Sequence, residues 1–277
     1  MEGVFTVMAL GPDNRYTPGQ PAGGWINTPG YGTAGTDAAA IDAGLRAYML
    51  RVFNWMASGL LLTGIVAFYV ANTPEIQALF WQVVRTPSGA RSVSPTILGW
   101  VAMLSPLAFV LVLSFGINRL SKTTAQALFW AFAAVMGLSL SNVFLRYTGA
   151  SIASTFFITA GTFAAMSLWG YTTKRDLTAM GSFLMMGLIG IIIASVVNMF
   201  LASSMMSFII SVLGVVIFTG LTAYDTQRIK SDYVEFAYAE GSDEAGKRSV
   251  MDALGLYLNF VNLFQMLLSL IGVRQNN

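Results

Sequence analysis

The sequence predicts an all-α, polytopic membrane protein with seven transmembrane helices, and two properties of the chain lead to this prediction. Only 10% of the 277 residues are charged and 55% are hydrophobic, whereas roughly 25% of the residues of a soluble domain are charged. Six segments contain no charged residue: 52–74, 92–118, 123–145, 147–173, 177–224 and 253–273. Each can cross a hydrocarbon core of about 30 Å, which takes about 20 helical residues. The segment 177–224 has 48 residues and must therefore hold two spans.

The chain before the first span is expected to be a disordered cytoplasmic tail over residues 1–45. Its first 40 residues contain eight glycines and four prolines without apolar periodicity. This segment lacks the basic and apolar regions of a signal peptide. A short helix around residues 42–49 is expected to lead into the membrane.

The membrane domain is predicted over residues 46–272, followed by a short C-terminal tail at 273–277. Its spans are predicted at about 50–71, 96–117, 124–145, 151–172, 181–201, 206–228 and 251–272. A polar turn at Ala202-Ser203-Ser204 separates the fifth span from the sixth. In the long loop 72–95, the segment 75–81 is expected to form a short interfacial helix.

The basic residues predict the orientation of the chain, because cytoplasmic loops carry an excess of lysine and arginine. With the N-terminus inside, eleven basic residues are cytoplasmic: Arg15, Arg46, Arg51, Arg119, Lys122, Lys174, Arg175, Arg228, Lys230, Lys247 and Arg248. The four others, Arg85, Arg91, Arg146 and Arg274, then lie outside. The sequence therefore predicts an N-in, C-out topology.

The chain contains no cysteine and no histidine. Thiolate nucleophiles, cysteine-bound clusters, imidazole bases and Ser-His-Asp triads are therefore excluded. Any binding of ions or protons must use carboxylates, amides, hydroxyls or backbone carbonyls.

Asp225 is the first charged residue after the 48-residue uncharged segment. It lies five residues before Lys230, which places it roughly 7–8 Å inside that boundary. An ionised carboxylate at such a depth costs at least about 2.5 kcal/mol unless it is paired or hydrated. Asp225 can extend to the interface or pair with Arg228 on the same helix. Arg119, at the inner end of the second span, is the other candidate partner, although it can equally be an interfacial anchor.

Small and polar residues recur at helical spacing on the sixth and seventh spans. On the seventh they are Asp252, Gly255, Asn259, Asn262, Met266 and Ser269, and on the sixth Ser211, Gly214, Thr222 and Asp225. Polar side chains in a membrane need hydrogen-bond partners, so these two faces are expected to meet inside the bundle. The contact can serve ion passage, or it can simply hold two helices together.

Three segments resemble the Bax inhibitor-1 family, also called the transmembrane Bax inhibitor motif family. They are 223–230 (AYDTQRIK), 254–264 (LGLYLNFVNLF) and the first span from Tyr48 to Thr63, and the resemblance covers about residues 46–272. It implies a seven-helix fold with the sixth and seventh helices central. It also implies a proton-sensitive calcium leak that is gated by an aspartate pair on these helices and an arginine from the second.

The resemblance assigns candidate gating residues. Asp225 and Arg119 match the family's aspartate and arginine, and Tyr224, Gln227, Arg228 and Asn262 are supporting residues within or beside the same motifs. Asn259 stands where the family has its second aspartate. Two close carboxylates can share a proton, whereas an aspartate and an asparagine cannot. We therefore expect little pH dependence between pH 6 and pH 8, unless Asp252, two turns away, acts as the second carboxylate.

The favoured function is a passive leak channel or carrier for calcium or another cation in the bacterial inner membrane. The alternative is a non-transporting membrane modulator that binds membrane proteases or stress-response partners. An intramembrane aspartyl protease would need a second facing aspartate, so no enzymatic activity is expected. No firm metal site or cofactor is assigned beyond transient Ca²⁺ near Asp225, and the expected partners are lipid and a cation, with no nucleic acid.

Overall fold

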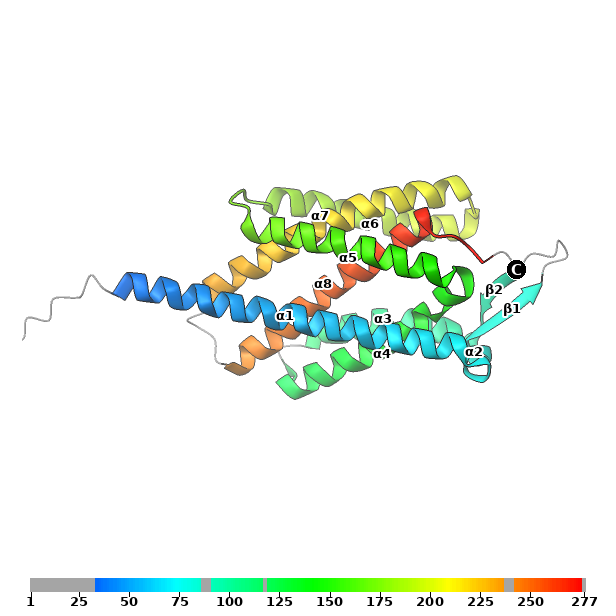
Figure 1. Cartoon of the computed structure of the whole chain (residues 1–277), viewed down its shortest axis with the longest axis horizontal. Coiled ribbons are helices and arrows are strands. Elements are labelled where there is room, and N and C mark those ends of the chain that lie inside the picture. Colours follow the sequence, from blue (N-terminus) through cyan, green and yellow to red (C-terminus); the bar gives the residue numbers. More distant parts are fainter. Residues whose placement is uncertain (1–32, 86–90, 117–118, 237–241, 276–277) are drawn as a thin grey trace, which may run out of the picture. The chain divides into compact units, whose positions relative to one another are not determined.

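The computed structural model describes residues 33–85, 91–116, 119–236 and 242–275, and within them it confirms the predicted fold class (Figure 1). The elements follow in the order α1 (Thr33–Asn72), α2 (Pro74–Phe80), β1 (Trp81–Arg85), β2 (Arg91–Pro95), α3 (Ile97–Gly116), α4 (Lys122–Arg146), α5 (Gly149–Thr172), α6 (Thr178–Leu201), α7 (Ser204–Phe236) and α8 (Ser242–Ile271). Seven of these described helices, all except α2, are long and apolar enough to cross a membrane. The chain divides into the units Met1–Ala39 and Ala40–Asn277, and all seven candidate spans belong to the second.

Each predicted span corresponds to one helix, but several helices extend beyond the apolar segments. The sixth and seventh predicted spans are α7 and α8, which continue to Phe236 and begin at Ser242. Residues 1–32 of the predicted tail lie outside the described residues. Apart from a short helix at 42–49, disorder was expected up to residue 45, whereas α1 begins at Thr33. The alanines at 38–40 favour a helix, and Leu45 is buried in the core.

The loop between the first two long helices forms a short helix and a hairpin. The expected helix is present as α2, but the antiparallel pair β1–β2, with Val83 opposite Val93, was not predicted. Trp81 is only 2% exposed, and its indole nitrogen donates a hydrogen bond to the hydroxyl of Ser141 on α4 at 2.7 Å. This bond fixes the start of the hairpin to the bundle.

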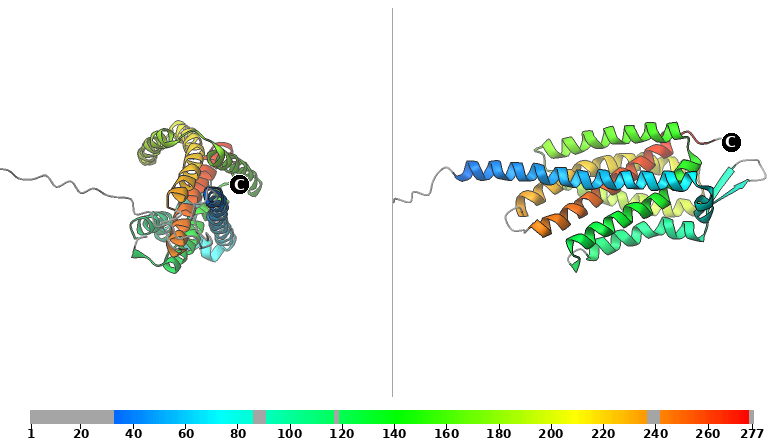
Figure 2. Two further views of the ribbon diagram at one scale, coloured as in Figure 1. Left: turned by 90° about the vertical axis from the view of Figure 1, so that its left-hand side faces the viewer. Right: turned by 60° about the horizontal axis from the view of Figure 1, so that its bottom comes forward.

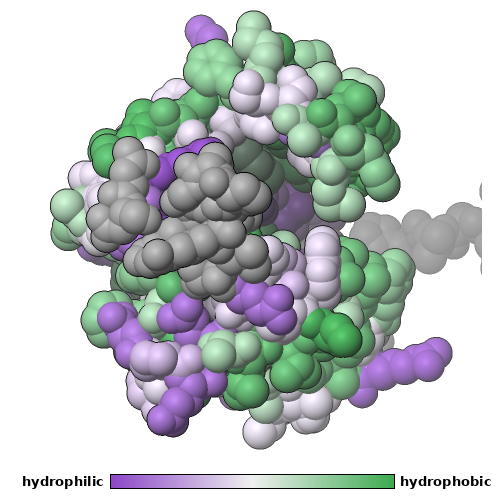
Figure 3. Space-filling model, turned by 90° about the vertical axis from the view of Figure 1, so that its right-hand side faces the viewer, coloured by the Kyte–Doolittle hydropathy of each residue, from purple (hydrophilic) through white to green (hydrophobic). Residues whose placement is uncertain are grey.

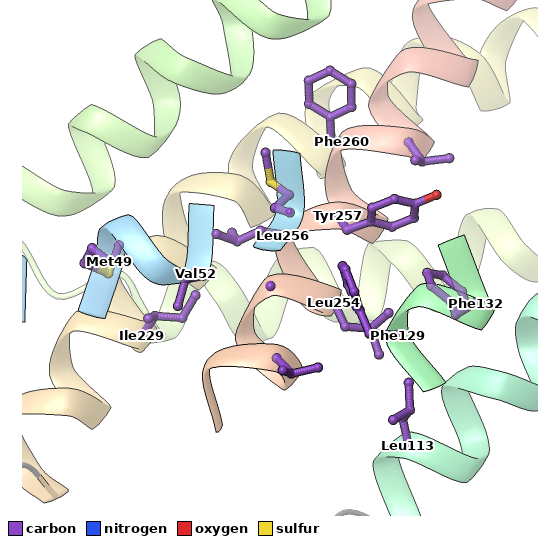
Figure 4. Packing of buried hydrophobic residues seen from close by; sticks show 14 of the residues in the cluster. Met49, Val52, Leu113, Phe129, Phe132, Ile229, Leu254, Leu256, Tyr257 and Phe260 are labelled. Carbon is purple, nitrogen blue, oxygen red and sulfur yellow. The ribbon is translucent and has the colours of Figure 1, made fainter. Parts of the chain in front are cut away.

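Helix α8 is the central element of the second unit. It packs against α7, α5 and α4, and in the end-on view of Figure 2 it runs between the other helices. Its fully buried Tyr257 lies with its ring edge-on to Phe129 and Phe132 of α4 (Figure 4). The Tyr257 hydroxyl lies 2.7 Å from that of Thr63 on α1, which in turn donates to the carbonyl of Ala133 at 2.8 Å. Helices α1, α4 and α8 thus share one buried polar contact.

Helices α5 and α7 approach closely where α5 carries Gly170. A Cβ atom at this position would overlap the backbone carbonyl of Ala223 on α7. The absence of a side chain at Gly170 therefore allows the two helices to pack at the level of the residues just before Asp225.

The C-terminal end of α8 is fixed to the turn between α4 and α5. The backbone amide of Thr148 donates to the carbonyl of Val273 and that of Gln275 to Arg146, at 3.0 and 2.9 Å. The amide of Val273 donates to the hydroxyl of Ser151. Figure 3 looks onto this end, where hydrophilic side chains gather on the lower part and hydrophobic ones along the flanks. With seven spans, this end and the start of the first span lie on opposite sides of the membrane.

A topology measurement tests the predicted orientation. A reporter fused after Asn277 should be extracytoplasmic and a reporter inserted near Ser242 cytoplasmic, because eleven of the 15 basic residues then lie inside. Paired alkaline phosphatase and green fluorescent protein fusions report the two sides. Phosphatase activity at Ser242 together with fluorescence at Asn277 would overturn the N-in orientation.

Candidate functional site

The polar faces of α7 and α8 meet along one antiparallel seam, as the spacing predicted. The seam consists of three residue pairs: Ser211 with Ser269, Gly214 with Met266, and Asp225 with Asn259. The two serine hydroxyls lie 3.0 Å apart, and a Cβ atom on Gly214 would overlap the Met266 side chain. These contacts hold the helices in one register over most of their membrane-spanning length.

Asp225 is the charged residue of this seam and lies at the end opposite to Ser211. The Asn259 amide nitrogen donates to its Oδ2 atom at 2.7 Å, and the Arg228 Nη2 atom lies 3.2 Å from Oδ1. The Asp225 side chain is 14% exposed and the Arg228 side chain 44%. A hydrogen bond to a charged group contributes about 1.5–3 kcal/mol, whereas an ion pair with a half-exposed arginine contributes at most about 1 kcal/mol. Each oxygen of the Asp225 carboxylate thus has one nitrogen donor, Asn259 from the facing helix and Arg228 from its own.

Arg119 does not form the expected pair with Asp225. It is exposed beyond the end of α3, and Asp225 instead pairs with Arg228, the local alternative that the sequence left open. Residues three positions apart are neighbours on one helix face, so the Arg228 pair needs no contact between distant helices. Helix α3 packs mainly on α4, α2 and β2, which leaves Arg119 as an interfacial residue.

Asp252 is buried on α8 at a different depth from Asp225. The Tyr48 hydroxyl of α1 donates to its Oδ2 atom at 2.6 Å. Asp252 lies seven positions before Asn259, or about 10 Å along the helix, so it does not face Asp225 as Asn259 does. Asp252 interacts electrostatically with Arg228, and so does Asp225. Arg228 is thus a charge that both carboxylates share.

The supporting residues fix α7 to its neighbours. The ring of Tyr224 packs against Gly181 of α6. Gln227 accepts a hydrogen bond from the amide of Leu177 and donates to the carbonyl of Arg175, both at 2.8 Å, and so binds the turn between α5 and α6. Asn262 donates to the carbonyl of Leu258 in its own helix and takes no part in the Asp225 site.

Asp176 lies in the same turn, outside the spans, and is exposed. The side-chain hydroxyl of Thr178 donates to it at 2.6 Å and the Thr178 amide at 2.8 Å. These hydrogen bonds hold the pKa of Asp176 below its ordinary value. The carboxylate thus remains charged beside the first turn of α6, where a negative charge is favourable.

Sequence reasoning missed the partners that α1 contributes. Tyr48 belongs to a segment that resembles the family, but nothing in the spacing indicates its hydrogen bond to Asp252, 204 positions away. The available signal is a tyrosine at the membrane boundary on the first span and an otherwise unpaired aspartate near the same boundary on the seventh.

The site is not a preformed calcium-binding site. Among the described residues, no group of three or more aspartate, glutamate, histidine or cysteine side chains is placed to hold a metal ion. Calcium takes six to eight oxygen ligands, and both oxygens of Asp225 are already engaged by nitrogen donors. A cation can bind here only if a donor moves away.

Comparisons with known proteins cover nearly all of the membrane domain. A family model described as inhibitor of apoptosis-promoting Bax1 matches residues 45–276. The chain is 49% identical over 236 residues to the uncharacterized protein RP147 of Rickettsia prowazekii, covering 85% of this chain and 93% of that one. It is 47% identical to an uncharacterized protein of Caulobacter vibrioides, over 84% and 91% of the two chains. It is also 45% identical to the inner membrane protein YbhL of Escherichia coli, over 84% and 94%.

A double-mutant cycle tests the partner of Asp225. Asp225→Ala and Asn259→Ala should each lower the free energy of unfolding in detergent, because each leaves a buried polar group without its partner. The double variant should lose less than the sum of the two, with a coupling of about 1–3 kcal/mol.

The matched control in this cycle is Arg119→Ala. Its effect should add to that of Asp225→Ala within about 0.5 kcal/mol, because the two side chains do not touch. Coupling of Asp225 to Arg119, together with additivity between Asp225 and Asn259, would refute this description of the site.

Proposed function

The chain belongs to the Bax inhibitor-1 family and is a multi-pass protein of the bacterial inner membrane, and we propose that it is a passive leak pathway for calcium or another cation. In this proposal, the Asp225 site between α7 and α8 controls the leak. The principal support is the position of a paired carboxylate inside a membrane-spanning helix.

Ionisable residues inside a membrane are costly and rare, and they commonly mark ion pathways. Asp225 lies within the span Ser204–Glu235, and its environment combines a carboxylate with the side-chain amide of Asn259. Carboxylate and amide oxygens are the ligands that Ca²⁺ prefers. Rotation of the Asn259 amide would present its oxygen, and not its nitrogen, to an arriving cation.

Arg228 is the proposed gating charge. It neutralises Asp225 directly and acts on Asp252 through space. Its side chain is 44% exposed, so it can turn outward without leaving a packed core. A cation can replace the guanidinium and keep the carboxylates neutral. In this proposal, the arrangement in which Arg228 pairs with Asp225 is the closed state of the leak pathway.

Catalysis is not part of the proposal. Activation of a water molecule by an aspartyl protease requires two facing carboxylates, and the side chain opposite Asp225 is the amide of Asn259.

The alternative proposal is a non-transporting modulator that acts through membrane protein partners. One observation favours it, namely that two cavities between the helices, of about 300 and 740 Å³, are lined almost entirely by apolar side chains. Neither includes Asp225 or Asn259. Flux through the purified protein separates the two proposals.

Calcium entry into liposomes that contain a trapped indicator tests the leak. The protein should raise the initial rate above that of empty liposomes, and Arg228→Gln should raise it further by up to about fivefold, because the lost ion pair contributes at most about 1 kcal/mol. Asp225→Asn should reduce the rate, since the site loses its charge. Lys174→Gln, an exposed residue of the α5–α6 turn, is the matched control and should leave it unchanged. Equal rates with and without protein would favour the modulator.

The pH dependence of the same flux tests the role of Asn259. Because an amide does not titrate, the leak of the unmodified protein should vary little between pH 6 and pH 8. Asn259→Asp would place a second carboxylate within hydrogen-bond distance of the first, and a proton shared by the pair would compete with the cation. This variant should therefore leak several-fold less at pH 6 than at pH 8. A steep response of the unmodified protein that Asp252→Asn abolishes would instead identify Asp252 as the proton sensor.

A further inference from the structure

An apolar groove runs between α1 and α5, which line the same cavity of about 740 Å³. Its floor is formed by buried side chains, namely Met49, Met56, Phe163, Ser167 and Phe260. Its rims carry Leu50 and Leu168, which are 56% and 64% exposed. Because the floor is closed and the rims are exposed, the groove opens sideways from the helix bundle, toward the surrounding lipid.

One end of the groove is polar and positively charged. Arg46 of α1 and Tyr171 of α5 both line it. The Lys230 ammonium donates to the carbonyl of Tyr171 at 2.9 Å and stands 5.1 Å from the centre of its ring. Arg46 therefore lines this end directly, and Lys230, which does not line the groove, adds a second positive charge beside Tyr171. The remaining lining is almost wholly apolar.

A buried hydroxyl without a partner lies just inside the charged end. Ser167 is 5% exposed and lines the groove, and its Oγ atom has no hydrogen-bond partner among the described residues. An unsatisfied buried polar group costs about 1–3 kcal/mol. Ser167 precedes Tyr171 by four residues, or about 6 Å along α5, so it lies one helical turn deeper than the charged end.

The length of the groove matches one leaflet of a bilayer. The lining residues extend from Arg46 to Ala57 on α1 and from Ala160 to Tyr171 on α5. Each stretch covers about 16 Å along its helix, and half of a hydrocarbon core of about 30 Å is about 15 Å. An acyl chain that enters with its headgroup at the Arg46 end would fill the groove to about the bilayer midplane.

We propose that this groove binds one anionic phospholipid from the leaflet at the Arg46 end, with an acyl chain on the apolar floor, its ester oxygens at the level of Ser167 and its phosphate group at Arg46. The order of charge, hydroxyl and apolar surface along the groove is that of the phospholipid itself. This site is separate from Asp225, and the proposal does not depend on whether the protein conducts ions.

Retained lipids test the proposal. The full chain is reconstituted into nanodiscs of equal parts phosphatidylglycerol and phosphatidylcholine, and lipids that remain bound are counted by native mass spectrometry. One phosphatidylglycerol should be retained in preference to phosphatidylcholine. Arg46→Gln should lower this preference by about fivefold, the contribution of one basic residue at an anionic surface. The exposed Arg51, five positions along α1 and outside the groove, provides the control Arg51→Gln, which should behave as the unmodified protein.

A second pair of variants tests the acyl chain. Ala164→Phe would fill the groove with a ring and should abolish retention of the lipid, whereas Ala165→Phe, at the neighbouring exposed position outside the lining, should not. The proposal is overturned if the two lipids are retained equally by the unmodified protein. It is also overturned if Arg46→Gln and Arg51→Gln have equal effects, or if Ala164→Phe retains as much phosphatidylglycerol as Ala165→Phe.

Discussion

A carboxylate inside an apolar layer must be neutralised or hydrogen-bonded, and the arrangement of α7 and α8 follows from this requirement at Asp225. An isolated charge at such a depth costs several kcal/mol. The structure meets this cost with an amide from the facing helix and a guanidinium from the next turn of its own helix. The amide contact is available only in one register of the antiparallel pair, and that register also brings Ser211 to Ser269 and Gly214 to Met266. Small residues at the other end of the seam let the same two helices stay in contact without a second charge.

The contacts of this helix pair extend into the rest of the bundle through buried polar groups. Tyr48 of α1 reaches Asp252, and Thr63 of the same helix reaches Tyr257, so α1 is hydrogen-bonded to α8 at two levels. Gln227 connects α7 to the turn between α5 and α6. If Arg228 moved away from the carboxylates, the change would therefore affect the contact between α7 and α8, while the neighbouring α1 and the α5–α6 turn stayed fixed by their own hydrogen bonds. Under the proposed function, opening is then confined to the α7–α8 contact and does not require repacking of the bundle.

The sequence was sufficient to predict the spans and the seam, because both depend on patterns within single helices. Gaps between charged residues placed all seven spans, and the spacing of small and polar residues identified the faces of α7 and α8 that meet. Contacts between helices that are distant in the sequence could not be predicted from patterns within single helices. The resemblance assigns Arg119 to Asp225, but the direction in which the end of α3 points is set by its packing on α4, and the residue is exposed. The hydrogen bond from Tyr48 to Asp252 was not predicted for the same reason. The hairpin β1–β2 was not predicted. Its two strands have five residues each and are separated by a segment with Pro and Gly, so the sequence shows too little periodicity to indicate that they pair.

Under the proposed function, α7 and α8 form a closed seam whose separation permits the leak. Because the chain contains no cysteine, a disulfide can be introduced across this seam as a direct test. The hydroxyls of Ser211 and Ser269 lie 3.0 Å apart, so cysteines at these two positions are close enough for a disulfide. The measurement is the calcium leak of the oxidised Ser211→Cys/Ser269→Cys protein in liposomes before and after reduction. We expect the disulfide to form, the leak to be low while it is intact, and reduction to restore the leak of the unmodified protein. An equal leak before and after reduction would show that the α7–α8 contact does not control the leak. Failure of the disulfide to form would show that Ser211 and Ser269 are not neighbours.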